Sequence, residues 1–313
     1  MEKKSRSPFA VMCLAFAFGV IALVTNLAVS FFYPRLFFWA GIQNEPEWIQ
    51  SLMDIAVYLA LLLPGALFLW LVFRENPAEE WRQTPGSPRL PFLFLPMALG
   101  AGYLVSLLGD YVCGDFLERF SQSSSAESYY TEPGAVALYF VSTCILAPLL
   151  EEYIYRGLLF KHLLPLGEGV AVFVTSLLFG LCHLSLSQTL FAFAVGISLG
   201  YARSRTGSIW FGVLIHFVTN LISFAVTYWA FVFEADWVEP VWTVVYTYLI
   251  NAAIAGVAVY IILRIIRKAK QRSLFRGLQI EKPKSNVKWI FANPFIYLFL
   301  FGYAALLFIY YHG

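Results

Sequence analysis

Residues 147–156 read APLLEEYIYR and place two consecutive glutamates, Glu151 and Glu152, inside an otherwise apolar stretch. The run from Ala135 to Val141, just before them, carries no charged residue and is expected to enter lipid. A carboxylate at the centre of a membrane helix costs about 3 kcal/mol even on insertion scales. Two in succession need a reason, and function is the first hypothesis for them.

The composition of the whole chain is typical of a membrane protein. Of its 313 residues, 60% are hydrophobic and 13% are charged, whereas soluble domains average about 45–50% apolar and about 25% charged residues. We therefore predict an all-α fold, a polytopic transmembrane helical bundle of eight to nine spans, with no separate soluble domain. The net charge of +2 points to no anionic partner, and no nucleic-acid partner is expected.

A membrane span needs roughly 20 apolar residues, and nine stretches are candidates. They are 9–32, 51–73, 91–112, 134–163, 168–184, 187–203, 208–232, 240–266 and 289–311. Pro148 is expected either to kink the fourth stretch or to start a new helical segment within it. We divide the chain into N-terminal helices and loops (1–133), a central core (134–232) and C-terminal helices with a basic loop (233–313).

The distribution of basic residues predicts the orientation, because they favour the cytoplasmic side of a membrane. With nine spans that start inside, nearly all Lys and Arg residues fall on inner segments, and only Arg35 and Arg119 fall outside. The loop 267–288 is the richest, and we interpret it as an orientation signal and a contact for anionic lipid. We expect a multi-pass protein of the cell membrane with a cytoplasmic N-terminus.

The two glutamates are predicted to have different neighbours. Glu152 and Arg156 are four residues apart, so they share a helix face and can pair. Glu151 is turned by about 100° from Glu152. Two close carboxylates in low-dielectric surroundings favour protonation of at least one, which is how a general acid or base is tuned. A purely structural Arg–Glu pair would explain Glu152 but not Glu151.

Two later spans carry histidine. His183 ends the fifth span, where a lone histidine is as often a hydrogen-bonded core residue as a functional one. His216 and Asn220 share one face of the seventh span, and by themselves they fit polar contacts between helices slightly better. The combination is more specific, because a carboxylate, a histidine and a His/Asn donor pair can activate water and hold an oxyanion. Those are the parts of a hydrolase.

Two other patterns are interpreted as structural. Residues 196–200 match G-x-S-x-G, which exposes a serine only on a sharp strand-to-helix turn. Here the pattern lies inside a predicted span, so Gly196 and Gly200 predict close helix packing instead. Asp54 and Asp110 lie near the outer ends of their spans and are expected at the membrane interface.

Three motifs, Glu151-Glu152-x-x-x-Arg156, Phe179-x-x-x-His183 and His216-x-x-x-Asn220, resemble those of the CPBP family. That family groups CAAX prenyl endopeptidases of the type 2 class with bacteriocin-processing and Abi proteins. The resemblance covers roughly residues 134–232 and implies an intramembrane endopeptidase that hydrolyses a peptide bond in a membrane-associated substrate. It assigns water activation to Glu151 and His183, oxyanion stabilisation to His216 and Asn220, and ordering of the site to Glu152 and Arg156.

The same resemblance raises the question of a metal, because Glu151, His183 and His216 could in principle ligate zinc. We favour direct activation of water without a cofactor. The three ligands lack a compact spacing, and Asn220 suits an oxyanion better than a metal.

Two other function classes remain as alternatives. A membrane transporter or proton relay would also use intramembrane Glu and His residues, although no inverted repeat is evident in the sequence. A non-catalytic membrane scaffold or immunity protein could keep the same fold without turnover.

Overall fold

The computed structural model describes residues 7–74, 77–82, 94–102, 104–105, 130–183, 185–233 and 288–312. Within these ranges the chain forms helices and short connections, and no strand occurs among them. Three helices are long and apolar enough to cross a membrane: α1 (Pro8–Trp39), α2 (Glu47–Phe73) and the continuous helix Pro133–Leu166. Shorter apolar helices span Glu168–Leu181, Trp210–Ala225 and Pro294–Leu306. The predicted all-α, polytopic membrane fold is confirmed.

The other helices, which include these shorter apolar ones, connect or flank the three long spans. They are α3 (Pro77–Trp81), α8 (Glu168–Leu181), α9 (Leu186–Thr206), α10 (Trp210–Phe233), α12 (Lys288–Phe291), α13 (Pro294–His312) and the 3-10 turns Ile42–Asn44 and Leu164–Leu166. Residues 94–102 are also helical. The predicted span 240–266, the basic loop up to residue 287 and most of the span 91–112 lie outside the described residues.

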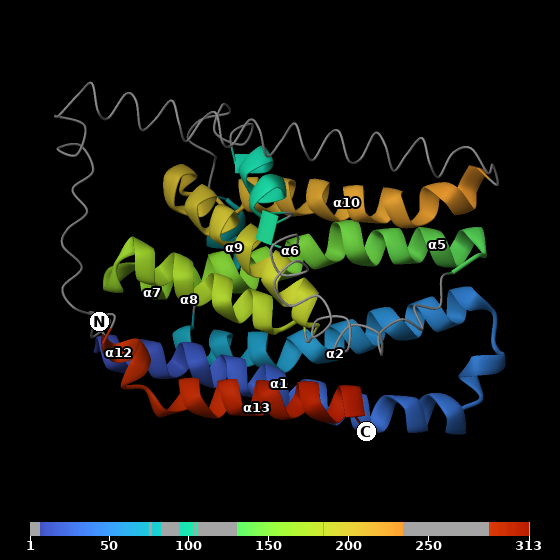
Figure 1. Cartoon of the computed structure of the whole chain (residues 1–313), viewed down its shortest axis with the longest axis horizontal. Coiled ribbons are helices and arrows are strands. Elements are labelled where there is room, and N and C mark those ends of the chain that lie inside the picture. The colour runs from blue at the N-terminus through green and yellow to red at the C-terminus, as the bar shows by residue number, and fades with distance from the viewer. Residues whose placement is uncertain are drawn as a thin grey trace.

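The helices form a row with a second group packed onto it. Helices α10, Pro133–Leu166, α2, α1 and α13 lie side by side in that order, each in contact with the next (Figure 1). Helices α8 and α9 pack tightly against each other and also contact the Pro133–Leu166 helix. This helix therefore has neighbours on several sides, and its Glu152 and Arg156 side chains are held inside protein.

The helix Pro133–Leu166 contains two π-helical stretches. It runs through α5 (Pro133–Phe140), the π stretch η3 (Val141–Leu146), α6 (Ala147–Glu152), the π stretch η4 (Tyr153–Leu159) and α7 (Phe160–Leu163). Both glutamates lie at the end of α6, between the two π stretches. Pi-helical turns are rare and frequently occur at functional sites. The change from η3 to α6 occurs at Ala147, and Pro148 lies in the first turn of α6 within one continuous helix.

Small residues bring α8 and α9 together. A Cβ atom on Gly196 would lie 3.1 Å from Ser176, and one on Gly200 would lie 3.2 Å from Val172. Larger side chains at these two positions would push the helices apart, so the predicted packing role of the glycine pair is confirmed. Ser198 lies buried within α9.

Two of the predicted spans differ most from the helices in the structure. The first continues past residue 32 to Trp39, because Pro34 removes one N–H donor but does not stop the apolar run. The last, predicted as one stretch over 289–311, is broken after Phe291. Asn293 caps the second part, accepting a hydrogen bond from the Phe295 N–H on its side-chain oxygen at 2.9 Å, and α13 starts at Pro294.

Candidate active site at the glutamate pair

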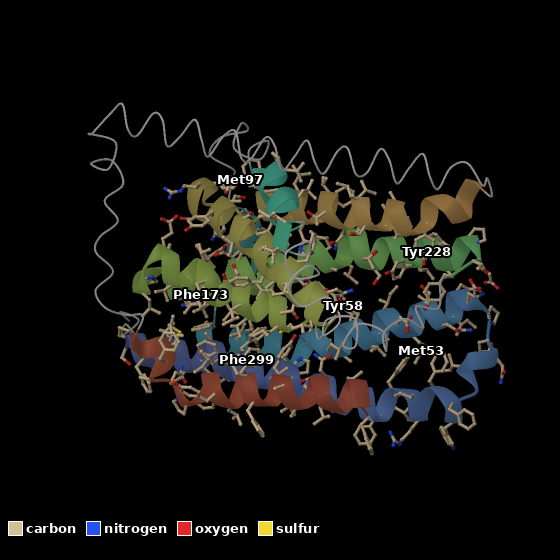
Figure 2. All side chains as sticks on the ribbon, in the orientation of Figure 1. Met53, Tyr58, Met97, Phe173, Tyr228 and Phe299 are labelled. Atoms are coloured by element: carbon tan, nitrogen blue, oxygen red, sulfur yellow. The ribbon has the colours of Figure 1, made fainter. Side chains whose placement is uncertain are left out.

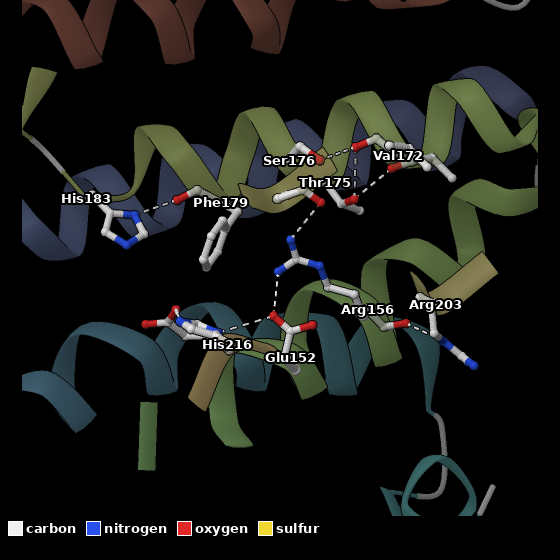
Figure 3. A network of polar contacts seen from close by, with 12 residues as sticks. Glu152, Arg156, Val172, Thr175, Ser176, Phe179, His183, Arg203 and His216 are labelled. Carbon is white, nitrogen blue, oxygen red and sulfur yellow. Dashed lines mark hydrogen bonds and ion pairs between the residues drawn. The ribbon is translucent and has the colours of Figure 1, made fainter. Parts of the chain in front are cut away.

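Glu152 and Arg156 form a fully buried ion pair. The Arg156 Nη1 atom donates to Glu152 Oε1 at 2.9 Å, and both side chains are 0% exposed. The second Arg156 terminal nitrogen donates to the Gly196 carbonyl oxygen at 3.2 Å. The guanidinium also lies over the Phe179 ring, 4.6 Å from its centroid (Figure 3). The predicted pairing is confirmed, and the pair ties α6 to α9.

The second oxygen of Glu152 is enclosed by the start of α10. Glu152 Oε2 is buried and accepts no hydrogen bond from any described residue. It lies against Gly212, where an added Cβ atom would come closer than 3.0 Å to it. Because Arg156 and His216 hold the other oxygen, this carboxylate has little room to move.

Replacing Gly212 with alanine is therefore expected to destabilise the protein by about 1–3 kcal/mol, the usual cost of overpacking. Gly169 is the matched control, because it also lies in the first turn of a helix but has nothing within 4 Å of its added Cβ. Thermal unfolding in detergent should show a lower midpoint for Gly212→Ala and an unchanged or raised one for Gly169→Ala. Equal midpoints for the two variants would mean that Glu152 is free to shift.

Glu151 has surroundings unlike those of Glu152. Its Oε1 atom accepts a hydrogen bond from the Tyr58 hydroxyl of α2 at 2.9 Å. Its Oε2 atom lies 3.9 Å from His216 Nε2, and the side chain remains 14% exposed. The sequence prediction that one carboxylate pairs with arginine while the other faces different neighbours is confirmed. Glu151 is the member of the pair that a water molecule or a substrate can reach.

His216 lies between the two glutamates. Its Nδ1 atom is 3.3 Å from Glu152 Oε1, while Nε2 faces Glu151. The Nδ1 contact is close but is not aligned as a hydrogen bond. The imidazole also packs nearly perpendicular to the Phe179 ring, with 5.5 Å between the ring centroids. The ring is thus oriented from three sides, and Nε2 is the nitrogen nearest the accessible carboxylate.

Asn220 lies one turn after His216 in α10 and contacts the glutamate-bearing helix at Thr143. Its side-chain amide donates to the Thr143 carbonyl oxygen at 2.8 Å. In η3 the Ala147 N–H bonds to Ser142 O, so the next donor in this register would be residue 148, which is proline and has no N–H. Asn220 supplies the missing donor. An amide nitrogen carries two hydrogens, so one remains for another acceptor.

His183 lies in the turn after α8. Its Nδ1 atom is 2.8 Å from the Phe179 carbonyl oxygen, which leaves Nε2 for other contacts. The Phe179 ring packs against both His183, at 5.0 Å, and His216. Among the described residues, no hydrogen bond or ion pair joins His183 to either glutamate. Of the residues predicted to form one site, the two glutamates, Arg156 and His216 lie within contact distance of one another. His183 packs on the Phe179 ring, which also packs on His216.

The sequence also offered Glu151, His183 and His216 as possible zinc ligands. No group of three or more His, Cys, Asp or Glu side chains in the described part of the chain is placed to hold a metal ion. Glu151, His183 and His216 are not among such a group, and the metal-free reaction stays a prediction.

Tyr58 is the site residue that the sequence analysis missed. It lies one turn after Asp54 in α2, and Ser51 precedes both on a similar face. Ser51 donates to the Ala135 carbonyl oxygen at 3.3 Å, so this face of α2 contacts the glutamate helix at two levels. A polar stripe at helical spacing inside an apolar span was the available signal.

Asp54 and His162 have structural contacts away from the two glutamates. Asp54 accepts hydrogen bonds from Tyr33, at 2.8 Å, and from Tyr130. It therefore joins α1, α2 and the segment before α5. Asp110 is outside the described residues. His162 stacks on Phe73 near the end of α2.

The central part of the chain is similar to known proteins. Residues 133–222 match the family model described as "Type II CAAX prenyl endopeptidase Rce1-like". The resemblance to the CPBP family is confirmed. The chain is also 26% identical to the Bacillus subtilis (strain 168) protein named "Putative membrane peptidase YdiL", over 177 residues that cover 55% of this chain and 69% of that protein. No solved structure matches it. The CPBP-like region contains both glutamates, both site histidines and Asn220, whereas Tyr58 lies outside it.

Proposed function

We propose that this protein is an intramembrane endopeptidase that hydrolyses a peptide bond of a membrane-associated substrate with water activated by Glu151 and His183. The observation that carries the proposal is the division of labour between adjacent carboxylates. Glu152 is sealed by Arg156, whereas Glu151 is partly exposed beside His216. The similarity to membrane peptidases supports the same reaction class.

The proposed reaction assigns one role to each of these groups. Glu151 accepts a proton from water, whose oxygen attacks the substrate carbonyl carbon. His216 and the second N–H of Asn220 stabilise the oxyanion that forms. Glu151 then returns the proton to the leaving amine as the C–N bond breaks. Glu152 and Arg156 keep His216 and the end of α6 in place, and His183 is assigned a hydrogen bond from its Nε2 side to the same water.

The location of charges supports a cell-membrane protein with a cytoplasmic N-terminus. The start of α1, the end of α2, α7 and the end of α9 lie at one end of the molecule (Figure 1). Described basic residues gather there, namely Arg74, Arg82, Lys161, Arg203, Arg205 and Lys288. Glu45, Glu47 and Glu132 lie at the other end. Basic residues favour the cytoplasmic side, so we assign the first end to the cytoplasm.

The proposal is tested with the purified full-length chain in liposomes. Two peptides of identical sequence ending in Cys-aliphatic-aliphatic-X, one farnesylated and one not, are offered together with a peptide that spans the bilayer. Mass spectrometry should find a new peptide end in at least one of them. Absence of cleavage, combined with a proton flux that Glu151→Gln removes, would favour the proton relay instead.

Turnover is expected to continue in the presence of a chelator. Direct activation of water by Glu151 needs no Lewis acid, so EDTA should change kcat less than twofold. The control is a zinc endopeptidase assayed in the same liposomes, which must lose its activity. Loss of turnover with EDTA and recovery with added zinc would refute the metal-free proposal.

A further inference from the structure

We propose that Tyr58 is a positioning residue of the active site, which holds the Glu151 carboxylate through its hydroxyl. This inference rests on the proposed function and extends the site to a helix outside the CPBP-like region. The Tyr58 hydroxyl donates to Glu151 Oε1 at 2.9 Å. It is the only hydrogen bond that Glu151 accepts from the side chain of any described residue, so the orientation of this carboxylate depends on it.

The position of Tyr58 is fixed by the packing of α2. The side chain lies between α2 and the helix that carries Glu151 (Figure 2). One turn earlier, Asp54 is held by Tyr33 and Tyr130, and Ser51 bonds to the Ala135 carbonyl oxygen. These contacts fix both the rotation and the depth of α2 relative to α5. The hydroxyl of Tyr58 is thereby delivered to the level of Glu151.

The hydrogen bond from Tyr58 gives the two carboxylate oxygens of Glu151 different neighbours. With Oε1 occupied by Tyr58, Oε2 is turned toward His216 Nε2, 3.9 Å away. That gap is wide for a direct hydrogen bond. The group that accepts the proton from water is thus kept beside the imidazole that faces the oxyanion. Without the hydroxyl, the carboxylate can rotate, and fewer molecules have the reactive geometry at any moment.

The proposal is tested by Tyr58→Phe, which removes one oxygen atom and keeps the ring. Tyr297→Phe is the control, because it also removes one tyrosine hydroxyl and its hydrogen bond, here to the Phe291 carbonyl oxygen, in a helix that has no part in positioning α2 or the glutamates. Cleavage kinetics should show kcat lowered about tenfold for Tyr58→Phe with KM unchanged, as expected for a lost hydrogen bond to a charged group. Tyr297→Phe should keep kcat within twofold.

A second measurement does not depend on turnover. Dicyclohexylcarbodiimide modifies carboxyl groups that are accessible from the apolar phase, and mass spectrometry locates the adduct. Removing the hydroxyl uncovers Oε1, so labelling of Glu151 should rise severalfold in Tyr58→Phe membranes and stay unchanged in Tyr297→Phe. The sealed Glu152 serves as the internal reference.

The two measurements separate the possible failures. A wild-type protein that cleaves none of the peptides, yet shows the labelling change, would overturn the proposed function and keep the Tyr58 contact. Unchanged labelling would overturn the contact itself. Raised labelling with unchanged kcat would overturn the positioning role, because the hydrogen bond would then not affect catalysis. A higher KM at constant kcat would also overturn it, because Tyr58 would then contribute to substrate binding.

Discussion

Replacing Glu151 with glutamine is expected to lower kcat by about 10²–10⁴-fold, the usual contribution of a positioned general base. The carboxamide has nearly the same shape, and its oxygen still accepts the hydrogen bond from Tyr58. It does not accept a proton from water. Because the site remains assembled, KM and the unfolding midpoint should stay close to those of the wild-type protein. Initial rates over a range of peptide concentrations measure this split.

The control for this variant is Glu168→Gln. Glu168 lies at the start of α8, bonds to Ser204 and Arg205, and has a side chain that is 33% exposed. It carries the same charge change without touching the site, and its kcat should stay within twofold of the wild-type value. Retained cleavage by Glu151→Gln would remove the central step of the proposed reaction. Equal losses in both variants would point to a general effect of charge.

Replacing Arg156 with methionine is expected to have the largest effect on stability. Arg156 is 0% exposed and is the only Lys or Arg side chain within pairing distance of Glu152 among the described residues. Its loss leaves a buried carboxylate without a counter-charge, which costs about 3–5 kcal/mol. The Gly196 carbonyl oxygen would also lose its donor. Denaturant unfolding in mixed micelles, followed by tryptophan fluorescence, measures the difference.

A double variant separates the cost of an unpaired charge from a simple packing defect. Glu152→Gln together with Arg156→Met removes both charges, and replacing both partners of a buried ion pair is often nearly neutral. The double variant should therefore recover most of the stability that Arg156→Met loses, although not the activity. If it is no more stable than Arg156→Met alone, Arg156 acts through its volume and its contact with Phe179.

Features that depend on neighbours along one helix could be predicted from the sequence. The Glu152–Arg156 pair follows from a spacing of four residues, and the continuous helix Pro133–Leu166 follows from an uninterrupted apolar run around a few charges. The shared face of His216 and Asn220 follows in the same way. Each of these needs only the period of the helix and the cost of leaving a charge alone in lipid.

Features that depend on contacts between helices could not be predicted. Nothing in the sequence says that Tyr58 meets Glu151, because the two are 93 residues apart and depend on the rotation of α2. The contact of Asn220 with Thr143 also requires knowing that the helix is wound as π there. The approach of Gly212 to Glu152 is of the same kind.

The two π stretches beside the glutamates also affect how this helix is compared with its relatives. An i→i+5 turn accommodates one residue more than a regular turn, so each stretch shifts all later side chains around the axis. A relative wound regularly throughout would need one residue fewer on each side of the acidic pair to present the same faces. Single-residue gaps in an alignment here would then record winding, and a gapless alignment would match Arg156 with a side chain that points elsewhere.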